Sequence, residues 1–175
     1  MKVILIGFMG AGKTTVGQLL AEKTTLPFFD TDQLIVTQTG QTPGEIFAIV
    51  GELGFRQLEQ TILQENLTKS GIMATGGGII ELEQNRQLLK SSPVPVIYLS
   101  GSFGQTVERL VKDNTRPIVR NKSLLELAEL WEQRLKKYSS IATEVIYTDN
   151  KTADQVAEEV FQYMRAFNDE TTENR

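Results

Sequence analysis

The chain has 175 residues, a length typical of a single domain with one hydrophobic core. Apolar residues make up 40% of it and charged residues 23%, with 14 Gly and 5 Pro, and this composition excludes a disordered or collagen-like protein. Because the sequence contains neither Cys nor His, disulfides, thiolate zinc sites and His-based catalytic sites are excluded, and acid–base chemistry must use Asp, Glu, Lys or Tyr.

Short apolar runs alternate with amphipathic stretches along the whole chain, a pattern typical of a parallel sheet covered by helices. The runs that read as strands are rich in Val, Ile and Phe, and they span 2–6, 27–29, 72–74, 94–99 and 144–147. The sequence therefore predicts an α/β fold with three layers, α/β/α, around a five-stranded parallel sheet.

Two capping boxes mark helix starts, one over 42–45 and one over 123–126. No internal repeat or Pro/Ser-rich linker divides the chain, so we expect one domain over 1–167 and a frayed tail over 168–175. The polar segment 113–122 lies between two helices and is expected to be a mobile flap or a solvated connection.

The charge balance and the short apolar runs limit the partners and location of the protein. With 22 acidic and 18 basic residues the net charge is −4, which predicts no nucleic-acid partner. The apolar runs are far shorter than the ~18 residues that a membrane span needs, and no signal-peptide pattern precedes the first strand. We therefore expect a cytoplasmic monomer that contacts no membrane.

Residues 7–14 read Gly-Phe-Met-Gly-Ala-Gly-Lys-Thr, the pattern G-x-x-x-x-G-K-[ST], between the first strand and an amphipathic stretch. Such glycines let backbone N–H groups turn around a phosphate at a helix N-terminus. Lys13 would then reach the β- and γ-phosphates, and Thr14 would place its hydroxyl on Mg²⁺. The alternative is a Gly-rich turn without a ligand. Because Thr15 stands where GxGxxG needs its third glycine, a dinucleotide site is disfavoured.

Asp30 and Asp32 follow the second strand, at the edge where ligands bind in open α/β sheets. In an extended segment, residues two apart point to one side, so both carboxylates are expected to face the crevice. One would lie near Mg²⁺ and the other near an acceptor hydroxyl. The alternative is that Asp32 caps a helix beginning at Gln33 and Asp30 is a turn residue.

Further along the chain, Arg56 and Glu59 lie one turn apart on a helix. They form either a surface ion pair or an Arg held by Glu59 to bind a substrate carboxylate. The run 75–78, Thr-Gly-Gly-Gly, ends the third strand and favours close approach of a ligand over a simple turn. The lone cations Arg109, Arg116 and Arg134 are not distinguished from solvated charges by spacing alone.

Taken together, these motifs resemble the shikimate kinase family of P-loop enzymes with the nucleoside-monophosphate-kinase-like fold. The similarity covers about residues 2–165 and rests on motifs that occur in the order GFMGAGKTT (7–15), D-x-D (30–32), GELGFRQLE (51–59), TGGG (75–78), Arg-Pro (116–117) and R-x-x-x-Y (134–138). It implies MgATP-dependent phosphorylation of the 3-hydroxyl of shikimate, a step toward chorismate and the aromatic amino acids.

The resemblance also implies a role for each matching residue. The implied ATP-binding residues are Gly10, Ala11, Gly12, Lys13, Thr14, Thr15, Arg109, Arg116 and Lys151, with Arg109 beside the adenine. The implied shikimate-binding residues are Asp32, Arg56, Gly76, Gly77, Gly78 and Arg134, with both Arg on the carboxylate. Lys13, Asp32 and Arg116 would be catalytic: Lys13 and Arg116 stabilise the phosphoryl group, and Asp32 orients or deprotonates the hydroxyl. Thr14 and Asp30 would organise Mg²⁺.

Two other functions fit part of the same pattern. One is another small-molecule kinase of this fold, such as a gluconate or nucleoside monophosphate kinase; the paired Arg argues against a nucleotide acceptor. The other is a nucleotide-binding module that has lost turnover. Such a module would be expected to lack a catalytic Asp or a substrate Arg, whereas Asp32, Arg56 and Arg134 are all present.

Overall fold

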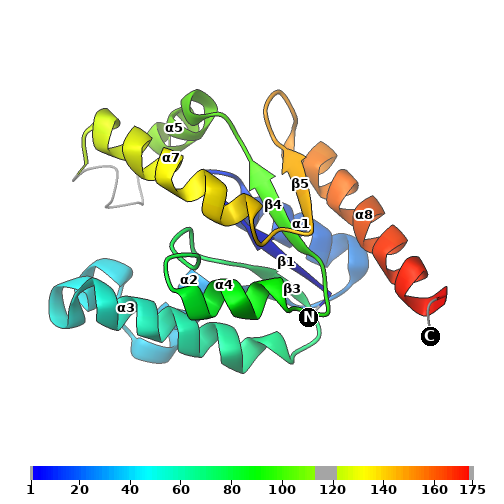
Figure 1. Ribbon diagram of the computed structural model, residues 1–175, viewed down its shortest axis with the longest axis horizontal. Coiled ribbons are helices and arrows are strands. Elements are labelled where there is room, and N and C mark those ends of the chain that lie inside the picture. Colours follow the sequence, from blue (N-terminus) through cyan, green and yellow to red (C-terminus); the bar gives the residue numbers. More distant parts are fainter. Residues whose placement is uncertain (1, 113–121, 174–175) are drawn as a thin grey trace.

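The protein contains a five-stranded parallel sheet of order β2-β3-β1-β4-β5, seen at the centre of the computed structural model (Figure 1). The strands are β1 (Val3–Ile6), β2 (Phe28–Asp30), β3 (Ile72–Ala74), β4 (Val96–Ser100) and β5 (Glu144–Tyr147). Every expected strand is present, with its ends shifted by at most two residues. The predicted α/β fold with a parallel sheet is confirmed.

The structure describes residues 2–112 and 122–173. Their helices are α1 (Lys13–Thr24), α2 (Thr31–Thr39), α3 (Pro43–Leu67), α4 (Glu83–Lys90), α5 (Phe103–Lys112), α7 (Leu124–Ser139) and α8 (Ala153–Glu173). Helix α8 thus continues into the segment expected to be a frayed tail. Arg116 and most of the expected flap lie outside the described residues. No helix in the described parts of the chain is long and apolar enough to cross a bilayer.

Helices cover both faces of the sheet because its strands are apolar on both sides. Along β1, Val3 and Leu5 face a core shared with α1 and α8, whereas Ile4 and Ile6 face a second core shared with α3, α4, α5 and α7. A smaller apolar cluster, which includes Ile35 and Phe55, joins α2 to α3 beside the sheet (Figure 1). These cores fix α1, α3 and α7, which carry the candidate site residues Lys13, Thr14, Thr15, Arg56 and Arg134.

Both predicted capping boxes are confirmed at the starts of α3 and α7. In the first box, the backbone N–H of Thr42 donates to the Glu45 carboxylate, and the backbone N–H of Glu45 donates to the Thr42 hydroxyl. Each exchange satisfies two donors that the first helical turn would otherwise leave unpaired.

Helix α3 contains a break at Gly51 that the sequence analysis does not anticipate. Gly51 has φ 69° and ψ −177°, a conformation that is essentially restricted to glycine. The break separates the capped first part of α3 from the second part, which carries Arg56 and Glu59 to the edge of the sheet. The direction of that second part therefore depends on one backbone conformation.

Replacing Gly51 by Ala is expected to lower the free energy of unfolding by about 1–3 kcal/mol, because Ala cannot adopt this conformation without strain. Gly44, in the same helix, is the matched control, since neither glycine has another atom within 4 Å of the Cβ that Ala would add. Gly44→Ala should raise stability by up to ~1 kcal/mol through helix propensity. Urea unfolding of both variants measures the difference, and equal effects would contradict the strain argument.

Candidate active site

The candidate site lies at the carboxyl edge of the sheet, where the loops after all parallel strands converge. A cavity of about 420 Å³ opens there. It is lined by residues from the loop after β1, the start of α1, the end of β2, the start of α2, the segment after β3, and α5: Gly10, Gly12, Lys13, Thr14, Thr15, Asp30, Asp32, Thr75, Gly77, Arg109 and Leu110. Two predicted sets of residues, the glycine-rich loop and the D-x-D motif, thus share one cavity.

The loop 7–12 forms a tight turn from β1 into the N-terminus of α1. Gly12 is the N-cap of α1 and has φ 91°, in the left-handed region that favours glycine. The loop backbone and the first turn of the helix provide N–H groups and the positive end of the helix dipole, which favour a phosphate. Lys13 is buried on the cavity wall, and its Nζ donates to the carbonyls of Gly7 at 2.8 Å and Phe8 at 2.9 Å.

Thr14 and Asp30 provide oxygen ligands of the kind that Mg²⁺ prefers. The Thr14 hydroxyl donates to Oδ2 of Asp30 at 2.7 Å, and both residues line the cavity. Among the described residues, no group of three or more His, Cys, Asp or Glu side chains could hold a metal alone. The residues therefore fit an ion that completes its coordination with phosphate oxygens and waters.

The D-x-D motif has a different geometry from the expected one. Asp30 ends β2 and is the N-cap of α2: its Oδ1 accepts from the backbone N–H groups of Asp32 at 3.0 Å and Gln33 at 3.3 Å. The interpretation of Asp32 as the cap of a helix starting at Gln33 is therefore wrong. The two Asp do not belong to one extended segment either, since Asp32 lies in the first turn of α2. Both nevertheless line the cavity.

The glycine run after β3 allows charged side chains to lie directly against the backbone. A Cβ at Gly76 would collide with Oδ1 of Asp32 and lie 2.9 Å from Oε1 of Glu59, and a Cβ at Gly78 would collide with the Arg56 guanidinium. The backbone N–H of Gly76 donates to the hydroxyl of the fully buried Thr31 at 2.8 Å. The run thus brings Asp32, Glu59 and Arg56 together beside the cavity.

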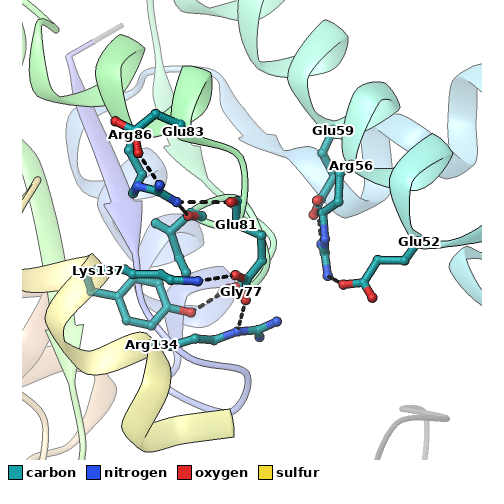
Figure 2. A network of polar contacts seen from close by, with 11 residues as sticks. Glu52, Arg56, Glu59, Gly77, Glu81, Glu83, Arg86, Arg134 and Lys137 are labelled. Atoms are coloured by element: carbon teal, nitrogen blue, oxygen red, sulfur yellow. Dashed lines mark hydrogen bonds and ion pairs between the residues drawn. The ribbon is translucent and has the colours of Figure 1, made fainter.

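Arg56 and Glu59 form a buried ion pair, so the interpretation as a surface pair is wrong. Arg56 Nη1 lies 2.5 Å from the Glu59 carboxylate, whose side chain is 1% exposed, and Nη2 lies 3.5 Å from Glu52 (Figure 2). Burial raises the pKa of Glu59 to about 7, against the opposing effect of Arg56. Burial lowers the pKa of Arg56, but Glu59, Glu52 and Glu81 together outweigh burial and the net shift is upward, so Arg56 stays charged. Arg56 Nε is buried and has no hydrogen-bond partner within residues 2–112 and 122–173.

Tyr138 of α7 reaches the glycine run, and Arg134, on the same helix, lies across from Arg56 in Figure 2. The Tyr138 hydroxyl donates to the carbonyl of Gly77 at 2.5 Å, and burial raises the pKa of Tyr138, which keeps it a neutral donor. Arg134 Nε donates to Oε1 of Glu81 at 2.6 Å, and the guanidinium lies over the Phe8 ring, 5.8 Å from its centroid.

Of the residues expected around the adenine, Arg109 lines the main cavity and Lys151 does not. Arg109 donates to the Thr148 carbonyl at 3.3 Å and lines both the main cavity and a neighbouring one of about 200 Å³. Lys151 lines the second cavity, and its Nζ lies 2.7 Å from a Glu159 carboxylate oxygen. The binding roles of all these residues stay predictions.

The sequence analysis missed several residues that shape the site. Thr31 lies between the two Asp of the motif, and its position there is the only signal that could have indicated it. Glu81 and Arg86 belong to no motif. Glu81 contacts residues distant in sequence, and Arg86 donates to backbone carbonyls. Neither kind of contact leaves a pattern in the sequence.

Known proteins resemble this chain in both sequence and fold. The family model for shikimate kinase matches residues 9–165. The shikimate kinase of Enterococcus faecalis is 36% identical over 165 residues, which cover 93% of this chain and 98% of that protein. The shikimate kinase of Lactococcus lactis subsp. lactis is 40% identical over 162 residues, covering 91% of this chain and 96% of the relative.

Solved structures give the same result. A shikimate kinase from Acinetobacter baumannii in complex with shikimate has a TM-score of 0.87 and 35% identity, with 94% of this chain and 92% of that chain covered. A gluconokinase from Sinorhizobium meliloti has a TM-score of 0.65 at 15% identity, covering 99% of this chain and 97% of its own, and shares the fold alone. On the match of the family model and the extent of identity, this chain belongs to the shikimate kinase family.

Proposed function

We propose that the protein transfers the γ-phosphate of ATP to the 3-hydroxyl of shikimate, with Mg²⁺, and releases shikimate 3-phosphate and ADP. The observation that carries the proposal is the position of Asp32. Its carboxylate lines the cavity that Lys13 and Thr14 also line, and it lies against Gly76 beside Glu59. One carboxylate thus stands between the phosphate-binding loop and the charged groups proposed to hold the acceptor.

In this reaction the protein acts mainly by placing charge and orienting the reactants. The loop N–H groups and Lys13 hold the β- and γ-phosphates, and Arg116 adds a second positive charge. Thr14 and Asp30 would hold Mg²⁺, which would supply positive charge to the phosphate oxygens. Asp32 orients the acceptor hydroxyl and accepts its proton, since the chain has no His for this task.

The acceptor side favours a carboxylate substrate. Arg56 lies against Gly78, and Arg134, which belongs to α7, lies across from Arg56 (Figure 2). Two guanidinium groups on one acid give the planar, bidentate recognition that Arg provides. The relative from Acinetobacter baumannii holds shikimate, a ring acid with several hydroxyls, and this supports shikimate over gluconate or a nucleotide.

An ADP-release assay with shikimate, quinate, gluconate and AMP tests the acceptor directly. We expect turnover with shikimate. Replacing Arg134 by Lys keeps the charge but removes the fork, and should raise the KM for shikimate about tenfold with the KM for ATP unchanged. Lys136→Ala, an exposed cation on the same helix, is the control and should change neither. Turnover with gluconate or AMP and none with shikimate would reject the proposal.

A second test concerns the Mg²⁺ ligand. Thr14→Val keeps the shape of the side chain but removes the hydroxyl, so kcat should fall by about 10² or more, whereas Thr14→Ser, which keeps the hydroxyl, should stay within about tenfold of the wild type. Chelation of Mg²⁺ should abolish turnover of the wild type. Equal rates for the Val and Ser variants would show that the hydroxyl has no role.

A third test concerns Asp32. Asp32→Asn preserves the volume and removes the charge, and kcat should fall by ~10² or more because the chain has no His that could replace this base. Since Asp30 rather than Asp32 caps α2, stability to urea should hardly change. Asp154→Asn makes the same substitution in the first turn of α8 and should leave kcat unaltered. Normal turnover of Asp32→Asn would remove Asp32 from the mechanism.

A further inference from the structure

Glu81 is an acidic residue at the edge of the site that the mechanism above does not use. It follows the glycine run and precedes α4, and its side chain is 21% exposed. Its Oε1 accepts from Arg134 Nε at 2.6 Å, and its Oε2 lies 2.5 Å from Lys137 Nζ (Figure 2). One carboxylate therefore bridges two cations that lie almost one turn apart on α7.

The contact leaves the binding edge of Arg134 available. A guanidinium presents its terminal nitrogens as a fork that matches a carboxylate, and Nε lies outside that fork. No described residue accepts a hydrogen bond from Nη1 or Nη2 of Arg134. Figure 2 shows these nitrogens pointing away from Glu81, toward the side on which Arg56 lies.

The backbone around Glu81 is held independently of its side chain. Arg86 of α4 donates to the carbonyls of Ile80 at 2.5 Å and Glu81 at 3.0 Å, and the N–H of Glu81 donates to the Gly78 carbonyl at 2.9 Å. A carboxylate on such a fixed backbone can set the direction of its partner. A second contact, the Phe8 ring under the guanidinium, restrains the plane of Arg134.

The charges of Glu81 and its two partners suit the binding of an anionic ligand. Glu81 meets two cations, so the group of three keeps one net positive charge for an anionic ligand. Burial would raise the pKa of Glu81, but Lys137 and Arg134 outweigh it and lower the pKa below its ordinary value. Glu81 is therefore ionised at neutral pH and holds the hydrogen bond to Arg134.

We propose that Glu81 is a positioning residue for the acceptor: by holding Nε of Arg134 it presents the terminal nitrogens of that guanidinium to the acceptor carboxylate. The inference rests on the proposed function. It also predicts that Glu81 acts through Arg134 and has no effect of its own on the acceptor.

A double-mutant cycle tests this directly. Glu81→Ala should raise the KM for shikimate about tenfold, the effect of losing one charge-assisted hydrogen bond, with kcat within about twofold and the KM for ATP unchanged. Glu81→Gln, which keeps an oxygen acceptor for Nε, should recover part of this loss. In the Arg134→Ala background, Glu81→Ala should have almost no further effect, because its partner is gone. Glu132→Ala, which removes an exposed carboxylate from α7, is the control and should behave like the wild type.

Two outcomes would overturn the inference. One is a KM for shikimate in Glu81→Ala that stays within twofold of the wild type or falls. The other is an equal effect of Glu81→Ala with and without Arg134, which would indicate a general structural role. Turnover of the wild type with shikimate separates this inference from the proposed function. Its absence rejects the function, and the role of Glu81 with it, whereas normal turnover with an unaffected Glu81 variant rejects only the inference.

Discussion

The absence of side chains at Gly76, Gly77 and Gly78 determines how closely the charged groups of the site can be assembled. A Cβ at the first position would collide with Asp32, and one at the third would collide with Arg56. The resulting contacts bring groups from α2 and α3 against the backbone that follows β3. The glycine run therefore serves the protein's own side chains as well as any ligand, and a larger residue there would move the groups that define the site.

Charge in this region is arranged in two ion-paired groups, one around Arg56 and one around Arg134. Arg56 lies between Glu59 and Glu52, and Arg134 shares Glu81 with Lys137. Because removing a charge from water costs as much as a buried pair regains, such pairs contribute little net stability. Their effect is geometric: each carboxylate fixes one edge of a guanidinium. This explains why charged residues lie in a part of the protein where apolar packing would be at least as stable.

Local sequence patterns predicted the secondary structure of the protein better than the contacts between residues distant in sequence. The strands and both capping boxes were readable because each depends on residues a few positions apart. The phosphate-binding loop was readable for the same reason. The alternative in which Asp32 caps the helix is wrong, and the sequence could not exclude it because Asp30 and Asp32 are equally good caps and the choice depends on where β2 ends. The burial of the Arg56–Glu59 pair and the contact between Glu81 and Arg134 depend on the packing of distant elements, which no local spacing encodes.

The raised pKa of Glu59 gives the protein a titrating group near neutrality, although the chain has no histidine. In the unfolded chain this carboxyl would titrate near 4.5, whereas in the fold its pKa is about 7. The folded state thus holds a proton more tightly than the unfolded state between these values. The contribution of Glu59 to folding stability is complete below pH 4.5 and is lost as the pH rises through 7. A carboxyl group next to Asp32 and Arg56 therefore titrates in the pH range in which an imidazole usually titrates.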